Sequence, residues 1–443
     1  MASGFKRLDV SLPNDLGKLA KGRDVCQRLK NRPPNFIYHK LSHDRSSPYR
    51  LLETALYKHL PDSVNRTLPN QPNTPSCQLP AGYHLVFFPP PTTNLLPDGT
   101  DDQHFPGKPW VRRMWAGGSI EFRTDHRRKA LTCEHKKFDL ARCREEIKDA
   151  VVKGSEGNEK VWVDIRRAIG LMHTSGKRSA KNAVEVEQAA IVERRNLVFM
   201  PAKTLEEAIN DVAKPTRTIK STMKPDFSVS MIPDANLLFR FSALTFNAHR
   251  IHLDRDYART VEGFRNLVVH GPLSILLMLK VLSSQMGSSK TGVPQMVKSI
   301  TYKNLAPLFA DEKMTICVRR SQPQPSAAST DGNDTETAGK VDSTPEKADS
   351  TPVETDSAPL QAGSTPKEAD SGITKWDVWI ENAEGGYAVK GSAETVAAGT
   401  VSTSTDVPSS DVSTPPKPTL RFFTPAKRTF RFVKDTKGQN HFS

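Results

Sequence analysis

Side chains that could move protons are concentrated in the segment Thr245-Phe-Asn-Ala-His-Arg-Ile-His-Leu-Asp254. Asn247 carries an amide, and His249 and His252 carry imidazoles that titrate near neutral pH. Histidine is therefore suited to take a proton from carbon or to give one to a leaving oxygen. Because the apolar run 236–246 precedes these residues directly, their polar groups need partners or a substrate. The cluster predicts a proton-transfer site.

A second feature follows at His270-Gly271, where an apolar segment begins. Pro272 favours the start of a helix, and residues 272–286 are apolar almost all round except for Lys280, which predicts an enclosed helix. The first N–H groups of a helix are unpaired and lie at its positive end. A backbone N–H at this helix N-terminus could therefore polarise a thioester carbonyl while a histidine moves the neighbouring proton. This combination suits the addition or removal of water beside a thioester.

Simpler roles compete with these assignments. A single histidine is usually a structural residue, and His270 is expected to cap or orient the Gly271 turn. Arg250 is expected to form an ion pair or, failing that, to bind phosphate, and Asp254 reads as a solvated loop residue. Three side chains that lie near each other in the sequence could suggest a metal site: Cys133, His135 and Cys143. Because no pair of cysteines separated by two residues accompanies them, we predict no metal there.

Length and charge limit the classes of protein to consider. The chain has 443 residues, enough for two or three domains, and a net charge of +14. A basic surface favours nucleic acid, coenzyme A or an acidic carrier protein as partner, but no nucleic-acid-binding motif accompanies the charge. Five scattered cysteines indicate a reducing compartment. No apolar run reaches the ~20 residues that span a bilayer.

Several segments are expected to form regular elements. The run 236–246 is strand-like, whereas 47–61 is typical of a helix. Residues 140–152 fit either a helix or a strand paired with 160–166. The remaining expected strands are 84–88, 118–122, 190–200, 314–319, 376–380 and 386–393.

Residues 321–373 form an acidic insertion with a seven-residue repeat. Proline recurs in each full repeat, which excludes a coiled coil and predicts disorder between two strands of one sheet. The Ser/Thr/Pro-rich segment 397–443 is expected to be a disordered tail. The basic extension 1–45 suits a mitochondrial transit peptide, although Asp9, Asp15 and Asp24 interrupt it.

Longer motifs carry a family resemblance over residues 80–320 and 374–396. They are Leu237-Leu-Phe-Arg-Phe-Ser-Ala-Leu-Thr-Phe-Asn-Ala-His-Arg-Ile-His252, Val261-Glu-Gly-Phe, Leu267-Val-Val-His-Gly-Pro-Leu273, Tyr302-Lys-Asn-Leu-Ala-Pro-Leu308, Pro106-Gly-Lys-Pro-Trp-Val-Arg-Arg-Met-Trp-Ala-Gly-Gly118 and Ile191-Val-Glu-Arg-Arg-Asn-Leu-Val-Phe199. The chain resembles the mitochondrial 3-hydroxyacyl-thioester dehydratases of type II fatty acid synthesis, relatives of the MaoC-type hydratases. This implies an α+β double hot-dog fold, in which two curved antiparallel sheets each enclose a helix. Residues 46–215 would be a degenerate first hot-dog and 216–396 the catalytic second one, and 140–152 would be a strand.

The resemblance also assigns roles to single residues. The MaoC-type motif reads Asp, any residue, Asn, Pro, an aliphatic residue, His; its His falls on His252, its Asp on Asn247 and its Asn on His249. Since an amide cannot act as a general base, Asn247 would hold the hydroxyl or water while His252 transfers the proton. The N–H for the thioester carbonyl falls on Gly271. Substrate binding is assigned to His249, Arg250 and His270, and no cofactor is implied.

The implied activity is dehydration of (R)-3-hydroxyacyl thioesters on acyl carrier protein to trans-2-enoyl thioesters, in mitochondria. Three alternatives remain open from the sequence. One is a hydratase or dehydratase of a short or dicarboxylic coenzyme A thioester. Another is a non-catalytic hot-dog protein that binds acyl chains or a partner, for which Asn247 is the best support. The third is nucleic-acid binding through the basic ends.

Overall fold

The structure is a computed structural model. It describes residues 22–41, 47–65, 77–123, 131–133, 139–155, 157–172, 189–215, 218–286, 295–321 and 372–397. All of these lie in one compact unit, Met1–Val401. Apart from their end residues, the expected insertion at 321–373 and tail at 397–443 fall outside the described residues. No helix in the described part is long and apolar enough to cross a membrane.

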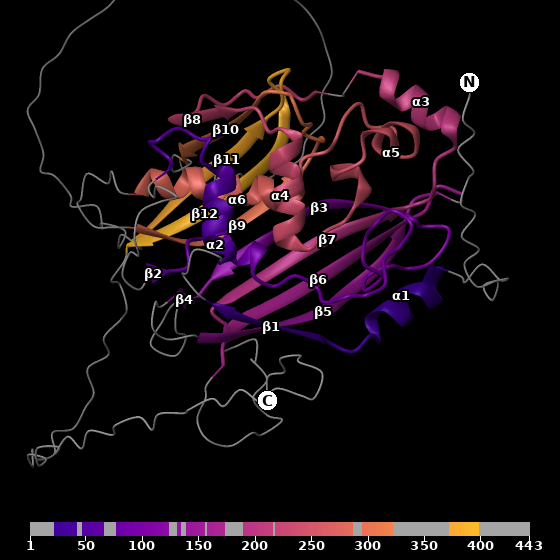
Figure 1. Cartoon of the computed structure of the whole chain (residues 1–443), viewed down its shortest axis with the longest axis horizontal. Helices are drawn as coiled ribbons and strands as arrows, with labels where there is room; N and C mark the ends of the chain where they lie inside the picture. The colour runs from indigo at the N-terminus through magenta and orange to yellow at the C-terminus, as the bar shows by residue number, and fades with distance from the viewer. Residues whose placement is uncertain are drawn as a thin grey trace, which may run out of the picture. The chain divides into compact units, whose positions relative to one another are not determined.

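Ten strands form one antiparallel sheet (Figure 1), in the order β1-β5-β6-β7-β3-β9-β12-β11-β10-β8. They are β1 (Asn35–Leu41), β3 (Arg112–Phe122), β5 (Asp139–Lys153), β6 (Lys160–Leu171), β7 (Ile191–Met200), β8 (Phe227–Met231), β9 (Gln295–Asn304), β10 (Met314–Arg320), β11 (Ile373–Glu381) and β12 (Tyr387–Ala397). A separate small pair joins β2 (Cys77–Gln78) to β4 (Thr132–Cys133).

The sheet consists of two halves with the same strand order. From its outer edge to the centre of the sheet, the N-terminal half has the strand order β1-β5-β6-β7-β3, and the C-terminal half has the order β8-β10-β11-β12-β9. In both halves, the strand that comes second along the chain is therefore the innermost. The second strands, β3 and β9, pair at the centre, with Gly118 opposite Tyr302. This repeat confirms the expected double hot-dog, and residues 140–152 form strand β5. The insertion connects β10 to its paired neighbour β11, as predicted.

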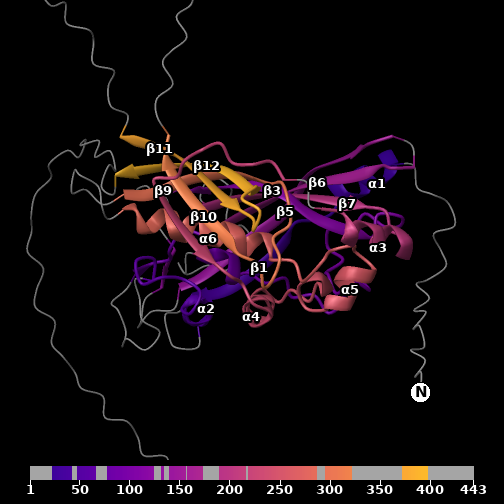
Figure 2. The ribbon, with the colours of Figure 1, turned by 90° about the horizontal axis from the view of Figure 1, so that it is seen from above.

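Helix α6 (Gly271–Ser284) lies between the C-terminal half of the sheet and two further helices, α2 (Pro48–Leu56) and α4 (Ala235–Thr245) (Figure 2). The remaining helical elements are α1 (Gly22–Lys30), η1 (Tyr83–Val86), α3 (Leu205–Ala213), η3 (Arg250–His252) and α5 (Arg255–Thr260).

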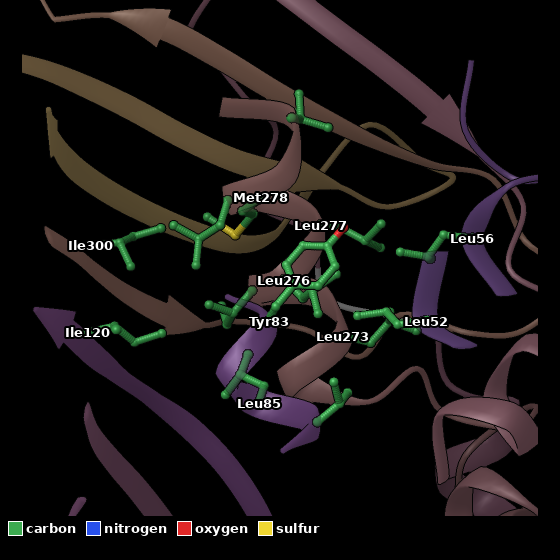
Figure 3. Packing of buried hydrophobic residues seen from close by; sticks show 14 of the residues in the cluster. Leu52, Leu56, Tyr83, Leu85, Ile120, Leu273, Leu276, Leu277, Met278 and Ile300 are labelled. Atoms are coloured by element: carbon green, nitrogen blue, oxygen red, sulfur yellow. The ribbon is translucent and has the colours of Figure 1, made fainter. Parts of the chain in front are cut away.

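Helix α6 forms the centre of the main hydrophobic core (Figure 3). Leu273, Leu276, Leu277 and Met278 are fully buried, which confirms the predicted enclosed helix. They pack with side chains from both halves of the sheet and from the helices that cover it: Leu52, Leu56, Tyr83, Leu85, Ile120 and Ile300. The position of α6 is therefore fixed by both halves of the chain.

Residues 236–245 lie in helix α4, so the prediction of a strand over 236–246 is wrong. Asp234 accepts a hydrogen bond from the N–H of Leu237 at 2.7 Å and caps the helix. Leu237, Leu238 and Phe241 are buried at helical spacing. A short apolar run does not reveal this spacing, because nearly every position is apolar whichever face is buried.

Residues 84–88 also differ from the expected strand, because Tyr83–Val86 is the 3₁₀ helix η1. Gly82 precedes it at φ +91°, and a Cβ there would lie 3.1 Å from Cδ1 of Leu279 on α6. Glycine thus provides both the left-handed turn and the close approach to α6.

The described part of the predicted extension 1–45 belongs to the fold, which corrects that boundary. Strand β1 pairs with β5 along its whole length, from Asn35 opposite Glu145 to Leu41 opposite Asp139. Helix α1 buries Val25 and Leu29 in the core of the N-terminal half. Residues 22–41 therefore supply the first strand of that half.

Lys280, the one cation in the apolar surface of α6, has buried partners. Its Nζ donates to Oε1 of Glu53 on α2 at 2.8 Å and to the hydroxyl of Tyr83 at 3.1 Å. The Tyr83 hydroxyl also donates to Glu53. This triad links α6 to two segments of the N-terminal half.

Replacing Glu53 with glutamine should lower the free energy of unfolding by about 3–5 kcal/mol, because Lys280 would remain buried without a counter-charge. The double variant Glu53→Leu/Lys280→Met should lose much less, since no buried charge is left. Urea denaturation of both variants measures the difference. Equal losses would show that side-chain packing rather than charge pairing holds the triad together.

Candidate active site

The turn after α4 places Asn247 and His249. Phe246 ends the helix at φ 52°, and the N–H of Asn247 donates to the Ser242 carbonyl at 2.9 Å. The Asn247 side-chain oxygen accepts a hydrogen bond from the backbone N–H of His249 at 3.1 Å. The chain then forms the short helix η3, which contains His252. Local backbone bonds therefore bring the three predicted residues into one turn.

His252 has a defined tautomer. Its Nδ1 lies 2.7 Å from the Val268 carbonyl, which can only accept, so Nδ1 carries the hydrogen and Nε2 keeps its lone pair. No described residue hydrogen-bonds to Nε2. Burial lowers the pKa of His252 to about 4, against the opposing effect of the Val268 carbonyl. At neutral pH the imidazole is uncharged, with a free acceptor nitrogen, as a general base requires.

His270 supports His252 from one side. The two rings stack with centroids 3.7 Å apart and planes at 21°. His270 Nε2 forms a 2.8 Å hydrogen bond with Oγ of Ser242, which links the start of α6 to α4. The side chain does not cap α6, contrary to one of the roles considered for it. It is fully buried, and burial lowers its pKa well below the usual range, so it too is neutral.

Gly271 begins α6 where the two halves of the sheet meet. A Cβ on Gly271 would lie 3.4–3.5 Å from Asn304 on β9 and Trp115 on β3. Asn304 Nδ2 donates to the Trp115 carbonyl at 2.8 Å, while its buried Oδ1 has no described partner. The Gly271 N–H is among the first N–H groups of the helix, which have no acceptor within it. A substrate carbonyl could therefore accept from it.

His249 faces a carboxylate that the sequence did not reveal. It contacts the His252 ring edge to face, with centroids 5.5 Å apart, and its Nε2 lies 3.7 Å from Oδ2 of Asp98. Asp98 lies in the loop before β3, in the N-terminal half. The segment Asp98-Gly99-Thr100 has the composition of a turn, which by itself does not indicate an approach to His249.

Arg250 forms an ion pair, as expected, with Asp254 at 2.7 Å, and its guanidinium lies over the Tyr257 ring. Asp254 also caps α5 by accepting from the N–H of Tyr257 at 2.9 Å, so it is more than a solvated loop residue. The Arg250 side chain is 47% exposed. Its assignment to substrate binding stays a prediction.

Acid should destabilise this protein through its neutral imidazoles. Burial lowers the pKa of His252 and of His84 from 6.5 to about 4. The unfolded chain therefore takes up protons first as the pH falls, and stability that is complete above pH 6.5 decreases between pH 6.5 and about 4. Each group contributes about 1.4 kcal/mol per pH unit.

Urea denaturation at pH 7 and pH 5 checks this, with His84→Leu as the comparison. The free energy of unfolding of the variant should depend less steeply on pH, because the proton that His84 takes up on unfolding is no longer involved. An unchanged slope would mean that His84 is not kept neutral in the folded chain.

The fold and the site define a double hot-dog enzyme of the hydratase and dehydratase class. The model of the hydroxyacyl-thioester dehydratase type 2 family matches residues 82–310, more than half of the chain. The chain belongs to this family, which confirms the resemblance drawn from its motifs, and it is a 3-hydroxyacyl-thioester hydratase/dehydratase.

Two relatives by sequence are named as enzymes of the hydratase and dehydratase class. The chain is 28% identical over 282 residues to the mitochondrial hydroxyacyl-thioester dehydratase type 2 of Schizosaccharomyces pombe, covering 61% of this chain and 86% of that protein. It is 30% identical over 248 residues to the mesaconyl-C(4)-CoA hydratase of Chloroflexus aurantiacus, covering 54% and 75%. Among solved structures, a MaoC-like dehydratase from Phytophthora capsici is similar at 13% identity and a TM-score of 0.45, covering 85% of this chain and 99% of that one.

Proposed function

We propose that this protein dehydrates (R)-3-hydroxyacyl thioesters carried on acyl carrier protein to trans-2-enoyl thioesters. The observation that supports this best is the free Nε2 of the neutral His252, on a ring that is stacked against the residue preceding the N-terminus of α6. His270 thus places the proposed base beside the proposed carbonyl-polarising group, because its ring stacks on His252 and its backbone leads directly into the N–H of Gly271.

In this mechanism the C2–H bond breaks and its proton moves to Nε2 of His252. The electron pair left behind is delocalised onto the thioester oxygen, where the Gly271 N–H stabilises the negative charge. Asn247 holds the 3-hydroxyl by hydrogen bonds. The C3–O bond then breaks, the C2–C3 double bond forms, and the hydroxyl leaves as water with the proton. His252 ends the cycle neutral, as it began.

The carrier and the compartment are inferred from charge and relatives. A net charge of +14 complements an acidic carrier protein. The relatives from Schizosaccharomyces pombe and Saccharomyces cerevisiae are both named mitochondrial, which supports a mitochondrial location. The Chloroflexus relative is named for a coenzyme A thioester and favours a second candidate, a short dicarboxylic acyl-coenzyme A.

Hydration of trans-2-enoyl thioesters tests both candidates. The protein is assayed with enoyl groups of increasing chain length, each on acyl carrier protein and on coenzyme A, and with mesaconyl-coenzyme A. We expect the largest kcat/KM on the carrier protein. A clear preference for the dicarboxylic coenzyme A thioester would select the second candidate. Binding of acyl carrier protein without turnover of any enoyl thioester would instead indicate a non-catalytic hot-dog protein.

A further inference from the structure

The loop that carries Asp98 is fixed against the turn that carries Asn247 and His249. The Asp98 carbonyl accepts a hydrogen bond from the N–H of Arg250 at 2.8 Å. Next to it, Gly99 adopts φ +82°, and a Cβ there would come within 2.0 Å of the Ala248 carbonyl oxygen. Only glycine allows this approach. The N-terminal half thus delivers one carboxylate directly to the site of the C-terminal half.

Only one of the two oxygens of the Asp98 carboxylate has hydrogen-bond partners among the described residues. Its Oδ1 accepts from the N–H of Thr100 at 2.9 Å and from the Thr100 hydroxyl at 2.6 Å. Oδ2 is buried without a hydrogen-bond partner, and so is Nε2 of His249, 3.7 Å away. Both residues are only 5% exposed. Buried polar atoms are nearly always paired, and catalytic hydrogen bonds that are long in an empty site shorten when substrate binds.

We propose that Asp98 supplies the carboxylate that the site lacks at Asn247, and that it acts by positioning His249 as a second proton-transfer group. The inference rests on the dehydratase function proposed above. With Oδ2 as acceptor, the hydrogen of His249 lies on Nε2, and Nδ1 keeps a lone pair. His249 is neutral at rest, because burial, and to a smaller extent His252 and Arg113, lower its pKa.

With Asp98 behind it, His249 becomes a second carrier for the proton on its way from C2 to the leaving oxygen. The proton taken from C2 by His252 passes to Nδ1 of His249, whose ring contacts that of His252. Asp98 stabilises the resulting imidazolium, as a carboxylate behind an imidazole does in catalytic triads. His249 then protonates the hydroxyl as the C3–O bond breaks, and water leaves. Both imidazoles are neutral again, and one proton has moved from carbon to oxygen.

Asp98→Asn tests this role because it keeps the shape of the side chain and removes its charge. We expect kcat for hydration of a short enoyl thioester to fall by roughly 10- to 1,000-fold, with KM within about twofold. Thr100→Val is the matched control. It removes a bond to Oδ1 and loosens the same loop, but leaves Oδ2 and His249 in place, so kcat should stay within about threefold.

The double variant Asp98→Asn/His249→Gln separates positioning from a purely structural role. If Asp98 acts through His249, Asp98→Asn lowers kcat by less than about threefold once His249 is glutamine. Additive losses in kcat, or an Asp98→Asn enzyme with near-normal kcat, would overturn the proposal. So would equal losses in Thr100→Val and Asp98→Asn. Those results leave the dehydratase function intact as long as His252→Ala is inactive, whereas a wild-type chain without turnover would refute that function instead.

Discussion

Replacing His252 with alanine should lower turnover of a short enoyl thioester by about 10²- to 10⁴-fold, the usual contribution of a general base. KM should change little, because in the proposed mechanism Nε2 takes the reacting hydrogen and contributes to the transition state rather than to binding. The tautomer set by the Val268 carbonyl is the reason to single out this imidazole. His270, stacked beside it, uses Nε2 to bind Ser242.

Steady-state kinetics of matched variants, with thermal melting of each, complete this experiment. Asn247→Ala should also be slow, because the hydroxyl loses its hydrogen-bonding partner. Asn247→Asp restores the carboxylate of the wider MaoC-type motif and should retain activity. His39→Ala, a histidine on the edge strand β1, should turn over normally. Near-normal turnover of a folded His252→Ala enzyme would show that the base is another residue.

The parts of this structure that the sequence predicts best are those determined locally. The enclosed helix after Gly271 follows from Pro272 and an apolar surface on all sides, both visible in the chain. The left-handed end of α4 at Phe246 has no such signal, because a non-glycine residue rarely adopts that conformation. Without a visible helix end, the sequence favours a strand for the apolar run 236–246.

Contacts between the two halves could not be predicted in the same way. Asp98 and His249 are far apart in sequence, and their approach depends on the packing of a loop against a turn. Likewise, strand β1 pairs with β5, although its segment of the chain is basic and has the composition of an N-terminal extension. Family motifs assign roles to His252, Asn247 and Gly271, because these residues lie in continuous segments. They did not identify a carboxylate that arrives from the other half.

Gly271→Val should abolish most turnover without unfolding the chain. The backbone of Gly271 is not left-handed, and a Cβ there would make ordinary contacts with Trp115 and Asn304 at 3.4–3.5 Å, so the first side-chain carbon fits. We expect the two γ-carbons of valine, which reach further, to crowd the helix N-terminus. A thioester carbonyl would then be held away from the Gly271 N–H.

Losing one donor to a developing oxyanion typically costs about 10²- to 10³-fold in kcat, which sets the size of the expected loss. Gly271→Ala provides the graded comparison: it should melt like the wild type and lose less activity, since only the Cβ is added. The two variants are measured by kcat and KM with a short enoyl thioester, and by thermal melting. A folded Gly271→Val enzyme with near-normal kcat would place the oxyanion donor elsewhere. If both variants instead melted early in proportion to side-chain size, the close packing of α6 against β3 and β9 would explain the glycine.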